Sequence, residues 1–140
     1  MGLPLPPFSW ENIHPILVNF TAALFPASVL SDLLGRLLGR ESLRHAAWWA
    51  LLYAAAVTPF TALAGWFWKR SIEAALSPEL IAVHQWLGIW LAFEFPVLLI
   101  WRWRFHRGGE SPGLAYLMTA ALTMLALIYQ GHVGGSMAFG

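Results

Sequence analysis

With 140 residues, 59% hydrophobic and 11% charged, the chain is too apolar for an ordinary soluble domain, in which about 25% of residues are charged. The net charge of +1 excludes a broad basic surface for nucleic acid, and the lack of cysteine excludes disulfides, thiolate metal sites and covalent c-type haem attachment. Composition therefore predicts one integral membrane domain, residues 1–140, whose first partner is the lipid bilayer.

An extended, proline-rich arm over residues 1–12 is expected before the first apolar stretch. Four stretches follow that are long enough to cross a hydrocarbon layer of about 30 Å as helices. Their predicted limits are residues 14–34, 46–68, 80–101 and 114–135. The fold class is therefore all-α, a four-helix transmembrane bundle, and the sequence motifs show no internal repeat.

The first span carries two features that affect its shape and its end. Pro15 fits the first helical position, and Pro26 predicts a kink. Asp32 and Arg36 are four residues apart, a spacing that places them on one helix face. We expect them to form an interfacial salt bridge.

Basic residues predict the orientation of the bundle, because cytoplasmic loops are enriched in lysine and arginine. The two loops opposite the termini hold six: Arg36, Arg40, Arg44, Arg102, Arg104 and Arg107. The terminal side holds Lys69 and Arg70. Both termini are therefore expected on the extracytoplasmic side. Tryptophans form an interfacial belt on each side: Trp48, Trp49, Trp101 and Trp103 on the inner side, and Trp10, Trp66, Trp68 and Trp86 on the outer side.

Three histidines, His14, His84 and His132, are predicted at similar depth on three helices near the outer side. Neutral imidazole is the commonest metal ligand, and the cores of helix bundles hold such sites. The pattern predicts a site for a metal ion or a metallated macrocycle. It leaves open the alternative that each histidine caps a helix or hydrogen-bonds at the interface. His45 and His106 lie among arginines in the inner loops, and we assign them no role.

Glycines accompany two of these histidines. Gly88 lies one turn from His84, and three glycines surround His132: Gly131, Gly134 and Gly135. The missing side chains would let a flat ring approach the backbone, or would simply allow close helix packing.

Glu94 is predicted at mid-membrane depth, where an ionisable residue is costly unless it is paired or functional. Its depth is close to that of Thr123, Thr58 and Ser28. We expect a hydrogen-bond network in which protonated Glu94 donates to one of these hydroxyls. A proton-relay or ion-binding role is the alternative.

Three motifs occur in a fixed order: His14-Pro15 with Val18 and Phe20, then His84 with Trp86, Leu87 and Gly88, and finally Gly131-His132-Val133-Gly134-Gly135. Together they resemble the small bacterial membrane proteins grouped as domain of unknown function 2231, over essentially the whole chain. The resemblance implies a four-helix architecture and a multi-pass location in the bacterial inner membrane.

Relatives commonly carry a second histidine five residues after the first, followed two positions on by proline, where this chain has Asn19 and Thr21. If that histidine is a ligand in relatives, Asn19 supplies at best a hydrogen-bond donor or a weaker ligand. Some relatives are joined to c-type cytochrome or other redox modules, which the resemblance makes a hint of electron transfer.

The leading hypothesis is a b-type cytochrome-like electron-transfer protein or redox subunit, with His84 and His132 as axial ligands of haem b and His14 near the ring. The alternative is a non-catalytic structural or accessory subunit of a larger membrane complex, with lipid or a zinc or copper ion at the histidines. A chlorophyll-type pigment is the third reading. A redox partner and a homo-oligomer stay open. The sequence has no Gly-x-Ser-x-Gly motif, no paired carboxylates and no phosphate-binding glycine loop that would indicate an enzyme.

Overall fold

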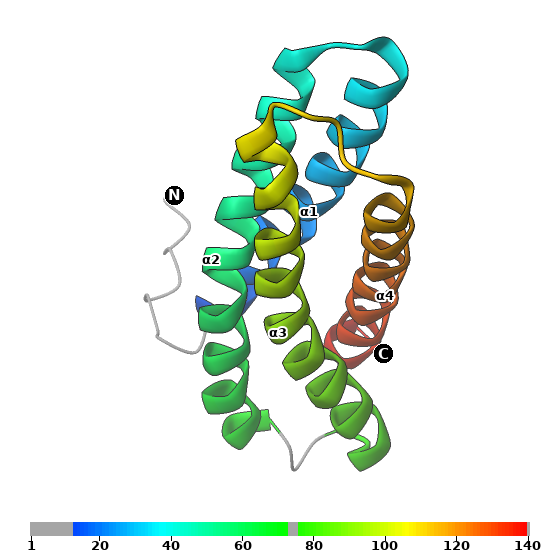
Figure 1. Cartoon of the computed structure of the whole chain (residues 1–140). Helices are drawn as coiled ribbons and strands as arrows, with labels where there is room; N and C mark the ends of the chain where they lie inside the picture. Colours follow the sequence, from blue (N-terminus) through cyan, green and yellow to red (C-terminus); the bar gives the residue numbers. More distant parts are fainter. Residues whose placement is uncertain (1–12, 73–75, 140) are drawn as a thin grey trace, which may run out of the picture.

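The computed structural model describes residues 13–72 and 76–139, and it contains four helices (Figure 1). They are α1 (Ile13–Leu38), α2 (Glu41–Ile72), α3 (Pro78–Gly108) and α4 (Leu114–Phe139). Each contains a segment long and apolar enough to cross a membrane, which confirms the all-α, four-helix transmembrane class. The predicted arm over residues 1–12, with Trp10, lies outside the described residues.

The helices extend beyond the predicted spans, because hydropathy marks only the part of a helix that lies in hydrocarbon. Only Gly39 and Arg40 separate α1 from α2, and Gly39 has a φ of 65°, the left-handed conformation that ends a helix. Ser77 caps α3 by accepting a 3.4 Å hydrogen bond from the N–H of Leu80. Gly109, with a φ of 67°, ends the same helix. Local capping residues therefore set the helix ends.

The helices form a ring in chain order, with α4 packed back against α1. One end of the bundle holds the α1–α2 and α3–α4 connections and six arginines, and we call it the basic end (Figure 1). The opposite end holds the start of α1 and the end of α4, and we call it the terminal end. Helices α1 and α3 run parallel on one diagonal of the ring. That the terminal end is extracytoplasmic stays a prediction.

The centre of the bundle is apolar and the outer surface is apolar too. Phe25 of α1 stacks on Phe95 of α3 with ring centroids 4.2 Å apart, and both side chains are fully buried. Large apolar side chains such as Phe20, Phe93 and Leu122 are more than half exposed. A membrane helix bundle shows this pattern, because lipid chains replace water around its outer surface.

Helices α1 and α3 also repeat the same residue spacing. His14, Phe25-Pro26 and Asp32 in α1 are each followed, 70 positions later, by His84, Phe95-Pro96 and Arg102 in α3. All three side-chain pairs meet across the diagonal. The shared offset places these pairs at corresponding positions along α1 and α3.

Asp32 does not pair with Arg36. Instead, Arg102 donates from Nε and Nη2 to the two Asp32 carboxylate oxygens, each at 2.8 Å, and Asp32 is 0% and Arg102 1% exposed. Arg36 Nη1 donates to the carbonyl oxygen of Pro112 at 2.9 Å. The i,i+4 spacing failed as a predictor because Asp32 lies on the face of α1 that points into the bundle, where a fork-shaped guanidinium from α3 reaches it.

Candidate functional site

At the terminal end, His14 of α1 and His84 of α3 face each other across the bundle. Their ring centroids are 6.3 Å apart and their planes are nearly perpendicular, at 84°. His14 is buried and His84 half-buried. Two of the three predicted histidines are therefore brought together.

Each imidazole ring lies directly against a glycine of the helix that follows it. A Cβ on Gly65 of α2 would lie 2.8 Å from Cε1 of His14, and one on Gly134 of α4 would lie 3.0 Å from Cε1 of His84. An added side chain at Gly65 would force the His14 ring to shift, and one at Gly134 would press tightly on the His84 ring. The flat ring that approaches the backbone here is the imidazole itself.

The His14 ring is oriented by its surroundings. Its Nδ1 lies 2.9 Å from the carbonyl oxygen of Thr61, which can only accept, so Nδ1 carries the proton and Nε2 carries the lone pair. The ring also contacts Trp68, with centroids 5.5 Å apart. Histidines that bind metals commonly donate their second ring N–H to a backbone carbonyl in this way.

The imidazole of His84 has fewer hydrogen-bond partners than that of His14. Its Nδ1 is buried and has no hydrogen-bond partner within residues 13–72 and 76–139. Gln130 of α4 donates from Nε2 to the backbone oxygen of His84 at 2.9 Å, and the Oε1 of Gln130 is also buried without a partner in that part of the chain. Buried polar atoms of folded proteins are rarely left unpaired, so these two atoms are exceptions among the described residues.

The other predicted site residues lie apart from this pair. His132 is exposed on the outer surface of α4, and a Cβ on Gly131 or Gly135 would meet nothing within 4 Å. Gly88 lies against Gln130, whose Nε2 would be 3.1 Å from its Cβ. The buried neighbour of His132 is Val133, so the helix turns the imidazole away from the bundle centre.

Glu94 is half-buried on α3 and makes no hydrogen bond or ion pair with any residue that the structure describes. Three hydroxyls expected near it bond elsewhere: Ser28 donates to Ala47 O at 2.8 Å, Thr58 to Ala54 O at 2.6 Å and Thr123 to Thr119 O at 3.0 Å. The expected network is therefore absent from the described chain. Serine and threonine in apolar helices satisfy themselves on nearby carbonyls.

The donor set limits what the site can hold. Within the described residues, no group of three or more histidine, cysteine, aspartate or glutamate side chains is placed to hold a metal ion. A haem ligated by His84 and His132 needs both imidazoles in one cavity, and the exposed position of His132 does not provide it. The residues as arranged do not fit that haem.

Sequence reasoning missed the residues that hold the pair, namely Thr61, Gly65, Trp68 and Gln130. Only Gln130 offered a signal, because an amide within an apolar span is costly unless it has a partner. The glycine and the carbonyl are local backbone features that become recognisable only once the helices are packed.

Comparison with known proteins agrees with this architecture. A family model described as a predicted membrane protein, domain of unknown function 2231, matches residues 11–140. No curated protein and no solved structure matched the chain. Because the match covers all four helices, the chain belongs to the domain of unknown function 2231 family of membrane proteins.

Proposed function

We propose that His14 and His84 bind one metal ion at the terminal end of the bundle, and that the protein acts as a non-catalytic, metal-holding subunit in the membrane. The observation that carries this proposal is the buried Nδ1 of His84, which lacks a partner in the described chain while its ring faces a second imidazole at 6.3 Å. A packing role alone would give that nitrogen no partner among the described residues.

The geometry of the two rings supports a shared ion. Two imidazoles on opposite sides of one ion, with metal–nitrogen bonds of about 2.0 Å, have ring centres roughly 6 Å apart. The separation of His14 and His84 is 6.3 Å. The hydrogen bond of His14 to Thr61 also leaves Nε2 of His14 as the nitrogen that can bind.

The chemistry of the pair favours copper(I) over zinc. Imidazole suits both ions, but zinc usually takes four ligands, and the described residues supply two imidazoles without a carboxylate. Two neutral ligands leave one positive charge with copper(I) and two with zinc. The smaller charge is less costly near the hydrocarbon layer.

Copper(I) titration of the purified protein under reducing conditions, against a chromophoric chelator, tests the proposal. We expect one ion per chain, and we expect His14→Ala and His84→Ala each to abolish binding. His132→Ala is the matched control and should bind as the unaltered protein does. Equal binding by all three variants, or no binding of copper(I) or zinc by the unaltered protein, would reject the proposal.

Haem-based electron transfer, the first hypothesis from the sequence, gives the opposite mutational pattern. A protein purified with haem available would show a reducible b-type spectrum that His132→Ala removes and His14→Ala retains. The same three variants therefore separate a metal-ion site from a haem site by absorption spectroscopy.

A further inference from the structure

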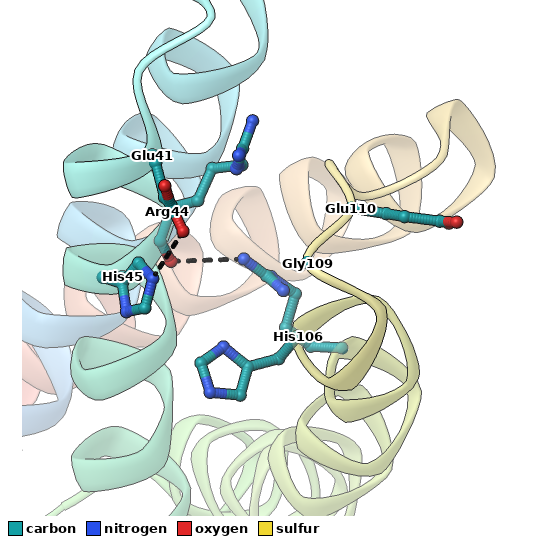
Figure 2. A pocket seen from close by; sticks show the side chains of 7 residues that line it. Glu41, Arg44, His45, His106, Gly109 and Glu110 are labelled. Carbon is teal, nitrogen blue, oxygen red and sulfur yellow. Dashed lines mark hydrogen bonds and ion pairs between the residues drawn. The ribbon is translucent and has the colours of Figure 1, made fainter.

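A small cavity lies at the basic end, between the start of α2 and the end of α3 (Figure 2). Its volume is about 20 Å³, which is room for one atom the size of a water oxygen. The lining residues are Glu41, Arg44, His45, Arg102, His106, Gly109 and Glu110. This cavity is at the opposite end of the bundle from His14 and His84, and the proposed function does not use it.

Arg102 lines this cavity, and its guanidinium has one donor without an acceptor among the described residues. Nε and Nη2 donate to Asp32, and Nη2 also donates to the carbonyl oxygen of Arg44 at 3.2 Å. Nη1 is buried and has no acceptor in residues 13–72 and 76–139, although Arg102 is 1% exposed. A charged donor left unpaired away from water is costly, so an acceptor is expected beside it.

We infer that this cavity binds one oxygen of a phosphate group, with Nη1 of Arg102 as the buried donor. A phosphate oxygen matches the cavity in size, and the remainder of the phosphate lies outside it at the surface. A guanidinium prefers a phosphate oxygen to a neutral acceptor, since the hydrogen bond is then charge-assisted.

The charge of this end favours an anion. Six arginines gather here against three carboxylates, Asp32, Glu41 and Glu110. Asp32 is paired with Arg102, and Glu41 contacts Nε2 of His45 at 3.3 Å. In Figure 2 the Glu110 side chain points away from the two histidines. Basic pockets between membrane helices at this level bind lipid head groups.

The height of the cavity matches the head-group layer. His106, in its lining, stacks on Trp48 with ring centroids 4.4 Å apart and planes at 7°. On the same helix, the Arg107 guanidinium lies 5.0 Å from the centroid of the Trp103 ring. Tryptophan and arginine together mark the boundary between hydrocarbon and water, so a phospholipid phosphate lies at this depth.

The first measurement is the phosphorus content of the protein purified in a phosphorus-free detergent. We expect about one phosphate per chain before exhaustive delipidation, and thermal unfolding after delipidation should shift upward when phosphatidylglycerol is added back. A diacyl glycolipid without phosphate is the lipid control, and inorganic phosphate alone is the second probe. Stabilisation by phosphatidylglycerol only assigns the site to lipid, and equal stabilisation by inorganic phosphate assigns it to the free ion.

The variant Arg102→Lys keeps a positive charge beside Asp32 but has no counterpart of Nη1. We expect it to bind phosphatidylglycerol about tenfold more weakly, as the loss of a charge-assisted hydrogen bond implies. Arg104→Lys is the matched control, because Arg104 is exposed two residues away and does not line the cavity. If neither phosphate source stabilises the unaltered protein, or if both variants respond as it does, the cavity holds water and the inference is wrong. If Arg102→Lys does not fold, the phosphorus content of the unaltered protein tests the inference by itself. A purified protein without bound phosphorus would overturn the inference.

Discussion

Helices α1 and α3 each contribute one residue to a facing pair at both ends of the bundle, and the two pairs differ in chemistry. At the basic end, Asp32 and Arg102 have opposite charges and satisfy each other with two hydrogen bonds of 2.8 Å. At the terminal end, His14 and His84 are identical residues, and no hydrogen bond joins them in the described chain. The same two helices therefore hold a satisfied ion pair at one end, and at the other two imidazoles that we propose as metal ligands.

Removing the Asp32–Arg102 ion pair should have the largest effect on stability. Asp32→Ala leaves the guanidinium of Arg102 buried without its counter-charge, which we expect to cost about 3–5 kcal/mol of unfolding free energy. Titration with SDS, followed by circular dichroism, measures this loss. His84→Ala in the same assay is the comparison, and it should cost clearly less. Equal losses at the two ends would contradict the division of roles.

The glycines beneath the imidazoles offer a second, smaller test. Gly65→Ala and Gly134→Ala place a methyl group 2.8 Å and 3.0 Å from the His14 and His84 rings, and we expect each to cost about 1–3 kcal/mol through overpacking and to weaken copper(I) binding. Gly131→Ala is the control, because its added Cβ meets nothing within 4 Å. It should be neutral or stabilising by up to about 1 kcal/mol, since alanine favours a helix over glycine. A Gly134→Ala variant as stable as Gly131→Ala would show that the His84 ring is not held against α4.

The smallest effect is expected at Glu94, which belongs to neither end. Glu94→Gln should change stability little and Glu94→Leu should be neutral or stabilising, because the carboxyl group makes no hydrogen bond in the described chain and an unpaired polar group in the membrane is costly. The sequence alone favoured a loss for leucine, through a network with Thr58 and Thr123. A marked loss for leucine, with glutamine unaffected, would restore that network.

The fold was predictable because four long apolar stretches permit little else in a bilayer, where backbone groups must bond within helices. Helix ends were less predictable. Arg36 and Glu41 are polar, yet both lie within helices, because capping at Gly39 decides where one helix stops. A hydropathy profile does not detect a capping glycine.

The site was predictable only in part. His14 and His84 could be chosen by residue type and depth, but the rotation that turns His132 outward depends on packing between α3 and α4. The pairing of Asp32 with Arg102 was hidden by the nearer Arg36. A signal was nevertheless present, because the spacing from histidine to Phe-Pro occurs twice, at Phe25-Pro26 and Phe95-Pro96.

The common spacing of α1 and α3 has a mechanical consequence. Asp32 follows His14 by 18 residues, and Arg102 follows His84 by the same number, which is five full helical turns and about 27 Å. Sliding or rotating α3 against α1 would therefore disturb both ends together. The ion pair between Asp32 and Arg102 sets the axial register of α3 relative to α1. Through that register it also sets the separation of the two imidazoles at the opposite end of the bundle, without contacting either of them.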